Sequence, residues 1–368
     1  MTLQEILKKY GISQRLIAAR AGYSPAVINK IIKHGKYPKT EDIAIVQKKI
    51  ETALSNSRII DKPEWESNKD KSKQNNNITE NLEMQMLSQA AKQLFHLPKS
   101  PFIDDVQNRD DVYLSAEQRY IRASMAMTAR HGGFMAIVGE SGAGKTTLKR
   151  DLIEGIAQDN DDVIIIQPQT IDKTRLTAVH ICDAIIDDVS QGNEAPKRSM
   201  EAKARQIRRL LTASARAGSK HCLVIDEAHD LTIPTLKHLK RFWEMEDGMK
   251  RLLAIVLIGQ PELKVKLNER NADVREVARR CEQVELQPLN AYVGEYLKHK
   301  LARVGKAFDD IFADDAMGGL TARLTQSTGN KTVSLLYPLI VNNAVIVALN
   351  AAAALGQDKI TADIFEGV

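Results

Sequence analysis

The residues best suited to chemistry form a glycine-rich run between an apolar segment and a helical pattern. The pattern G-x-x-x-x-G-K-[ST] is met without a mismatch by Gly139, Glu140, Ser141, Gly142, Ala143, Gly144, Lys145 and Thr146. Glycines let successive backbone amides point at phosphate oxygens, and the dipole of the following helix adds positive potential. Lys145 would reach the β- and γ-phosphates of ATP, the Thr146 hydroxyl would bind Mg²⁺, and Thr147 would complete the nucleotide contacts. The alternative is a glycine-rich turn with a coincidental Lys-Thr pair.

An acidic pair follows a second apolar run, at residues 222–226. Asp226 is expected to hold the magnesium ion, and Glu227 to polarise a water molecule for attack on the γ-phosphate. The alternative for such a pair is an ordinary helix N-cap. His229 completes an Asp-Glu-Ala-His run, which resembles helicase motifs but also occurs widely in other P-loop ATPases, so we give it little weight.

Three further polar residues suit nucleotide hydrolysis. Gln260 follows an apolar run at 252–258 and would sense the γ-phosphate, although Pro261 also suits a simple helix start. Arg279 and Arg280 precede the last strand, and either is a candidate arginine finger for a neighbouring subunit's ATP. Positive charge near a helix C-terminus is favourable in any case, so that alternative stays open.

Alternating strand and helix patterns must position these residues. Short apolar runs at 134–138, 163–167, 222–226, 252–258 and 283–286 are separated by helical patterns at 145–158, 174–189, 198–217, 233–246 and 261–280. This alternation predicts an α/β fold with a largely parallel sheet covered by helices on both faces, over residues 134–289. From Asn290 to the end we expect no strand. A helical subdomain, 290–368, is predicted from patterns at 290–304, 314–327, 332–354 and 359–366.

The first 55 residues have the capping and turn residues of an all-α helix-turn-helix domain. Ser13 can cap one helix, Gly22 permits a left-handed turn, and Pro25 suits the first position of the next helix. The face expected to enter a DNA major groove carries Ser24, Ala26, Asn29, Lys30 and Lys33. A helical packing or oligomerisation module is the alternative.

The charge distribution supports a DNA-binding arm. Residues 1–60 hold eight Lys and three Arg against one Asp and three Glu, a net +7, so the whole chain's +5 leaves −2 for the remaining 308 residues. Few side chains of the arm suit base readout, which favours binding to the phosphate backbone. In the core, Lys173 and Arg175 are further DNA candidates. Basic residues at 197–209 would serve similarly if they are not simply a solvated helix face.

Composition sets the remaining boundaries. Residues 56–80 are too polar to bury a core and are expected to form a flexible linker, and helical patterns resume in an adaptor segment, 81–133. Three scattered cysteines indicate neither a disulfide framework nor a zinc site. We find no signal peptide and no uninterrupted run long enough to cross a membrane, and Val341–Leu355 suggests a buried helix. A cytoplasmic protein is expected, in a bacterium or a phage-infected host.

Residues 134–368 resemble AAA+ ATPases in five features. These are the phosphate loop, the Asp-Glu strand, the polar strand tip, the arginine before the last strand, and a helical lid. The Gly-Gln-Pro-Glu-Leu run at 259–263 and the Leu-Gln-Pro-Leu run at 286–289 resemble the branch of bacteriophage Mu B-like transposition proteins, transposon target-selection ATPases and ExeA-like secretion ATPases. Lids in this superfamily often carry Gly-Asn-Pro-Arg, whereas this chain has Gly329-Asn330-Lys331-Thr332. Lys331 is therefore the candidate for the nucleotide contact of the lid arginine.

The order of helix-turn-helix, polar linker and AAA+ core also resembles the Mu B-like proteins. ExeA-like proteins are expected to carry a membrane segment and a periplasmic peptidoglycan-binding region, neither of which we find in this sequence. The resemblance implies an ATPase that uses ATP and Mg²⁺ to form a homo-oligomer or helical filament on double-stranded DNA. It would deliver that target DNA to a transposase and stimulate strand transfer. Alternatives are a helicase loader or replication initiator, and a nucleotide-switched transcription regulator.

Overall fold

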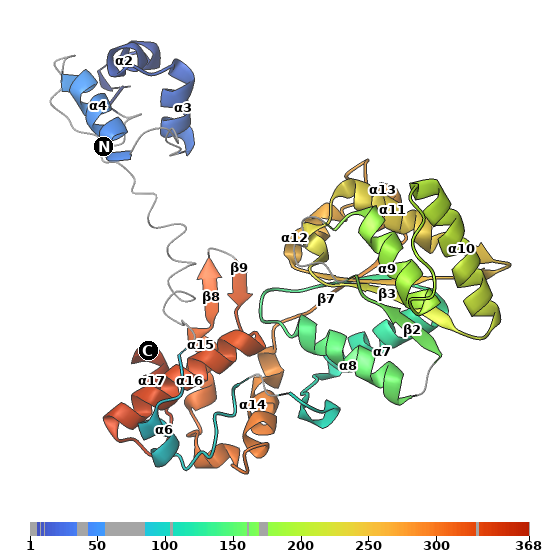
Figure 1. Cartoon of the computed structure of the whole chain (residues 1–368). Helices are drawn as coiled ribbons and strands as arrows, with labels where there is room; N and C mark the ends of the chain where they lie inside the picture. Colours follow the sequence, from blue (N-terminus) through green and yellow to red (C-terminus); the bar gives the residue numbers. More distant parts are fainter. Residues whose placement is uncertain are drawn as a thin grey trace. The chain divides into compact units, whose positions relative to one another are not determined.

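The computed structural model describes residues 6–7, 9–10, 12–34, 43–55, 85–103, 106–159, 162–168, 176–328 and 331–367, at some helix and strand positions by the backbone alone. The predicted linker at 56–80 lies outside the described residues. The chain divides into two units, Met1–Asn81 and Leu82–Val368 (Figure 1). Over the described residues, the first has one apolar core and the second has two.

The first unit contains the helices α2 (Gln14–Ala21), α3 (Pro25–His34) and α4 (Ile43–Ser55). The Ser13 hydroxyl accepts a hydrogen bond from the amide of Leu16 at 3.3 Å and so caps α2. Gly22 adopts φ +77° and ends that helix, because its left-handed conformation suits glycine. The helices bury Ile17, Ile28 and other apolar side chains against one another. The predicted pair of helices joined by a turn is therefore present.

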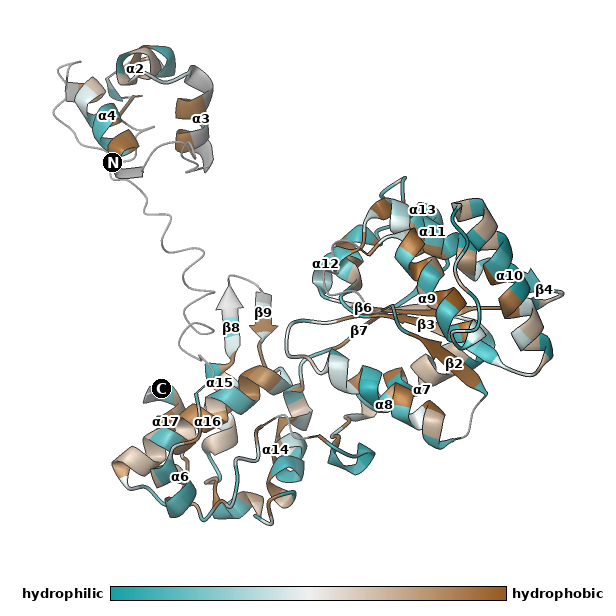
Figure 2. Cartoon of the chain, viewed as in Figure 1, coloured by the Kyte–Doolittle hydropathy of each residue, from teal (hydrophilic) through white to brown (hydrophobic). Residues whose placement is uncertain are grey.

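The second unit is built on a five-stranded sheet. Its order is β2 (Val163–Ile166), β3 (Lys220–Ile225), β6 (Ala254–Gly259), β1 (Phe134–Val138) and β7 (Glu282–Glu285), and every neighbouring pair is parallel. The central strands are strongly apolar (Figure 2) because both of their faces are covered. The α/β prediction is confirmed. Since β6 lies between β1 and β3, the carboxyl ends of these three strands meet at one edge.

Helices cover both faces of this sheet (Figure 1). One apolar core joins alternate strand residues to α7 (Ala116–His131) and α8 (Lys145–Gln158). The other core joins the opposite strand face to α9 (Ala178–Ser190), α10 (Met200–Arg216) and α11 (Ile233–Trp243). The two-residue side-chain period of each strand makes this division possible. Smaller elements are α12 (Pro261–Lys266), α13 (Arg275–Ala278), η1 (Arg109–Asp111), η3 (Ala228–Asp230) and the hairpin of β4 (Glu246–Asp247) and β5 (Lys250–Arg251).

A helical region follows the sheet. It contains η4 (Asn290–Tyr292), α14 (Val293–Ala302), η5 (Phe308–Asp310), α15 (Ala316–Arg323), α16 (Pro338–Leu355) and α17 (Ala362–Gly367). The earlier helix α6 (Gln89–Leu94) contacts α16. The Asn350 side chain secures this segment, since its oxygen accepts from the Ser88 amide at 2.9 Å and its nitrogen donates to the Met86 carbonyl at 3.1 Å.

A hairpin in this region corrects the prediction that no strand follows Asn290. Strands β8 (Thr325–Thr328) and β9 (Lys331–Ser334) pair antiparallel, so the predicted helices at 314–327 and 332–354 are wrong at these residues. The hairpin sequence is rich in threonine and contains Val333, and β-branched residues favour strands. Pro338 occupies the first turn of α16, which fits a later helix start.

Within the described part of the chain, α16 is the one helix whose length and composition would allow it to cross a membrane. In this structure it buries Val341, Val345 and Leu349 among other apolar side chains. Its Asn342 oxygen also accepts a hydrogen bond from the Tyr296 hydroxyl at 2.7 Å. These contacts are those of a core helix, as the sequence suggested.

Candidate nucleotide-binding site

The glycine-rich run forms a loop between the end of β1 and the start of α8. Gly142 and Gly144 adopt φ +76° and +93°, which lets the chain turn sharply before α8 begins at Lys145. The Gly139 amide donates to the Gly259 carbonyl at 3.1 Å and ties the loop to β6. A Cβ atom on Gly142 would lie 2.3 Å from Cβ of Leu339, so the start of α16 closely approaches this loop.

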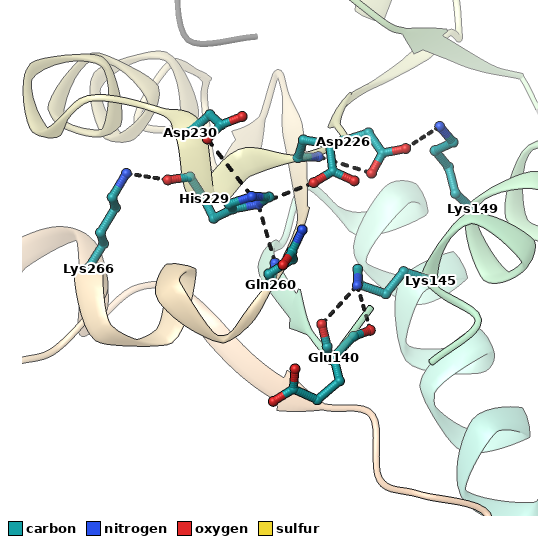
Figure 3. Close-up of polar contacts among 10 residues, drawn as sticks. Glu140, Lys145, Lys149, Asp226, His229, Asp230, Gln260 and Lys266 are labelled. Carbon is teal, nitrogen blue, oxygen red and sulfur yellow. Dashed lines mark hydrogen bonds and ion pairs between the residues drawn. The ribbon is translucent and has the colours of Figure 1, made fainter. Parts of the chain in front are cut away.

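Lys145 lies inside the loop. Its side chain is only 8% exposed, and its Nζ donates to the carbonyls of Gly139 and Glu140, both at 2.8 Å (Figure 3). Burial lowers the pKa of Lys145, and the charges of Glu227 and Asp226 oppose that shift. The loop therefore holds one cation that faces the acidic end of β3.

Asp226 follows β3 and is held by two donors. Its Oδ1 accepts from the Glu227 amide at 3.0 Å, and its Oδ2 pairs with Nζ of Lys149 at 2.5 Å (Figure 3). The sequence reasoning missed Lys149. A signal was available, because Lys149 lies four residues after Lys145 and so shares its face of α8.

The next residues join the end of β3 to the end of β6. Glu227 adopts a left-handed conformation with φ +54°, which is uncommon outside glycine. Its Oε2 lies 3.3 Å from Nδ1 of His229, and the same ring nitrogen lies 3.4 Å from the Gln260 amide. Gln260 occupies the N-cap position of α12, directly before Pro261, and its side chain makes no capping hydrogen bond. The structure thus places Gln260 beside the acidic pair.

The two candidate arginines differ in their surroundings. Nε of Arg279 lies 3.4 Å from Oε2 of Glu269, and both side chains are mostly exposed. Arg280 is held more closely, because its Nη1 lies 2.5 Å from Oε1 of Glu244 and its guanidinium lies over Trp243 at 6.0 Å. No contact in the described residues joins either arginine to the phosphate loop, so the structure does not bring them to the site within one chain.

The donor set suits magnesium. Among the residues that the structure describes, no group of three or more His, Cys, Asp or Glu side chains could hold a metal ion by itself. Magnesium prefers hard oxygen ligands and is usually bound by one or two protein groups together with substrate phosphates. The Asp226 carboxylate and the Thr146 hydroxyl are such oxygens, and Thr146 is exposed at the start of α8.

The other predicted ligand contacts are only partly described. Ser24 is exposed and Asn29 half-buried in the first unit, whereas the side chains of Ala26, Lys30 and Lys33 on α3 lie outside the described residues. The same holds for the Lys331 side chain at the start of β9, and Lys173 and Arg175 are outside altogether.

The basic residues at 197–209 differ in their exposure and in their partners. Lys203 is 6% exposed and pairs with Asp183, so it cannot face DNA. The outer face of α10 is different. It carries an open groove of about 430 Å³ that is lined by Arg205, Arg208, Arg209, Thr212, Ala213 and Arg216.

Comparison with known proteins places the site in a family domain. Residues 128–267 match the model of the AAA domain family. General secretion pathway protein A of Aeromonas hydrophila is 31% identical over 231 residues, which are 62% of this chain and 39% of that protein. The chain therefore spans well under half the length of this relative.

Two solved structures have similar chains. Cdc6p from Pyrobaculum aerophilum matches with a TM-score of 0.47 and 16% identity, covering 71% of this chain and 67% of the other. A chain of Drosophila ORC bound to DNA matches with a TM-score of 0.48 and 15% identity, covering 80% and 72%. The domain match and the parallel sheet with its phosphate loop lead to one conclusion. Residues 128–267 carry an ATPase domain of the AAA+ class.

Proposed function

We propose that this protein uses ATP to assemble on duplex DNA, presents that DNA to a transposase and stimulates strand transfer. Hydrolysis then controls its release. The observation that carries the DNA part is the arginine groove of α10, which lies on the ATPase domain itself. The basic helix-turn-helix arm supplies a second contact. The proposal of a transposase as partner rests on the resemblance of the motifs, and of their order along the chain, to Mu B-like proteins.

The groove suits a phosphate backbone. Its arginines at 205, 208, 209 and 216 recur at helical spacing, so they share one face of α10. Acidic neighbours pair with three of them, because Arg205 lies 3.4 Å from Glu201, Arg209 lies 2.5 Å from Glu194 and Arg216 lies 2.9 Å from Asp247. Arginine rows of this kind bind successive phosphates without reading bases. We therefore expect binding that is largely independent of DNA sequence and sensitive to salt.

The nucleotide site couples binding to turnover. Lys145 binds the phosphates, Asp226 and Thr146 would hold the Mg²⁺ that neutralises them, and Glu227 orients the attacking water. An arginine of the next subunit completes the site. Arg279 suits that role better than Arg280, since its single ion pair is long and exposed. Hydrolysis would then depend on assembly.

Electron microscopy of the protein with duplex DNA and a slowly hydrolysed ATP analogue tests this proposal. Continuous filaments on DNA are the expected result, and Glu227→Gln should trap them with ATP itself. If Glu227→Gln with ATP binds DNA no better than the wild type, the coupling of hydrolysis to release is wrong. Isolated closed rings would point to a helicase loader, and a discrete footprint to an initiator or a transcription regulator.

The secretion relative favours a second candidate, an ATPase of a general secretion pathway. That function predicts ATP hydrolysis that does not respond to DNA. Measuring hydrolysis with and without duplex DNA separates the two. A pull-down with a transposase then distinguishes transposition from other DNA-dependent functions.

A further inference from the structure

We propose that His229 is a positioning residue that holds Glu227 in its working orientation and ties that orientation to the end of β6. This inference rests on the proposed role of Glu227 in hydrolysis. The ring lies between two strand ends that carry polar residues of the site, Glu227 after β3 and Gln260 after β6. No contact of His229 with nucleotide is required.

The contacts of the ring carry the argument. Nδ1 lies 3.3 Å from Oε2 of Glu227. Nε2 faces Oδ1 of Asp230 at 3.8 Å (Figure 3). The His229 side chain is only 15% exposed, so neighbouring groups fix it. A ring N–H that engages one carboxylate oxygen restrains Glu227 and leaves the other oxygen available to a water molecule.

The backbone around the ring is also held. Lys266 donates to the carbonyl of His229 and, at 3.1 Å, to that of Leu231. A Cβ atom on Gly259 would lie 3.1 Å from the His229 amide nitrogen, so the end of β6 packs directly against this residue. The short segment after β3 therefore packs directly against the end of β6 and is hydrogen-bonded to α12.

One ring atom serves both strand ends. Nδ1 lies 3.4 Å from the Gln260 amide, which can only donate, and 3.3 Å from the Glu227 carboxylate, which can only accept. A neutral Nδ1 carries either a hydrogen or a lone pair, so it can serve one partner at a time. The Gln260 amide donates to Nδ1 in this structure, so a retreat of that amide would free Nδ1 to carry a hydrogen and donate it to Glu227.

Steady-state ATPase kinetics of His229→Ala, His229→Asn and Glu227→Gln test the proposal. General-base catalysis contributes a factor of about 10²–10⁴. Losing its alignment in His229→Ala should therefore lower kcat roughly tenfold, with KM and the nucleotide Kd nearly unchanged. His229→Asn places an amide N–H near the position of Nδ1 and should recover much of the loss. His238→Ala, a half-buried histidine on α11, serves as the control and should leave hydrolysis unchanged.

The double variant shows whether His229 acts through Glu227. Adding His229→Ala to Glu227→Gln should cause no further loss of kcat. If the double variant loses as much further activity as His229→Ala loses alone, His229 does not act through Glu227 and the proposal is overturned. It is also overturned if His229→Ala lowers the Tm together with kcat and His229→Asn does not recover the activity, because this result would show a structural role. If His229→Ala is fully active and Glu227→Gln is inactive, the positioning role of His229 is wrong, whereas the role of Glu227 in hydrolysis stands. A fully active Glu227→Gln would instead remove Glu227 from the proposed mechanism.

Discussion

Lys149 places an ammonium group beside Asp226, the residue that is expected to bind magnesium. Its ammonium group lies 2.5 Å from the Asp226 carboxylate, and each side chain is less than one-fifth exposed. A metal ion that binds Asp226 must compete with this ion pair, because both need the same carboxylate oxygens. Lys149 therefore sets how readily the acidic end of β3 accepts a cation.

Lys149→Met should consequently strengthen metal binding. The half-saturating Mg²⁺ concentration for binding a fluorescent ADP analogue is expected to fall several-fold, since Asp226 no longer has an internal partner. Removing one member of the half-buried pair should also lower the Tm. Arg150→Met removes the same charge from the exposed neighbouring position and is the control. An equal change in Arg150→Met would assign the effect to general electrostatics.

Sequence spacing predicted the phosphate loop and the acidic pair because these motifs are local. Lys145 and Thr146 follow a strand and open a helix, and that context is visible in the chain itself. Helical spacing places Lys149 on the same face of α8 as Lys145. Its contact with Asp226, and that of His229 with Gln260, could not be predicted, because they join elements that meet only in the folded sheet. Residue roles that depend on tertiary contact need the structure.

At the scale of elements, the segment around η1 joins the sheet region to the helical region. On one side, Nε of Arg109 lies 3.0 Å from Oδ1 of Asp151, which is buried on α8. On the other side, Oδ1 of Asp111 accepts from Nε of Arg303 at 3.0 Å, near the end of α14. Since α8 begins at the phosphate loop, this segment can couple the loop to the C-terminal helices.

Asp111→Asn should loosen that link in a pH-dependent way. Amide donors at Gln107 and Asn108, with the charge of Arg303, lower the pKa of Asp111 below its ordinary 3.8. The stability that its charge contributes is thus present above that value and lost as the pH falls through the lowered pKa. The Tm of Asp111→Asn is expected to be roughly 2–4 °C below wild type near neutral pH.

Calorimetry from pH 7 down to pH 3 measures this effect. The difference between wild type and variant should shrink over the last part of that range as Asp111 becomes protonated. A difference that stays constant down to pH 3 would show that the charge of Asp111 is not its cause. Asp110→Asn, the neighbouring residue in η1, is the matched control.

The elements themselves were predicted unevenly. The five strands of the sheet start and end within two residues of their apolar runs, because short apolar runs between helical patterns are distinctive. The β8–β9 hairpin was missed because Thr325 and its neighbours are mostly polar and show no apolar run. Helical periodicity on both sides hid the short interruption.

At the scale of the whole molecule, the charge asymmetry now has two structural locations. Residues 1–60 carry a net +7, and the rest of the chain carries −2. The second unit nevertheless presents a concentrated arginine groove on α10, so a near-neutral body still offers a local site for polyanions. A tethered basic arm and a fixed basic groove would contribute separately to DNA affinity.

Salt dependence of DNA binding can distinguish these contributions. Removing one basic side chain that binds a phosphate should reduce the slope of log K against log salt by about 0.9. In the full-length protein with a slowly hydrolysed ATP analogue, Arg205→Glu/Arg208→Glu is expected to reduce the slope by about two. Lys30→Glu/Lys33→Glu should have a similar effect if α3 lies against the backbone. Basal hydrolysis without DNA should persist in both, since neither pair lies in the nucleotide site. An unchanged slope in the α10 variant would exclude the groove from DNA binding and leave the arm to provide it.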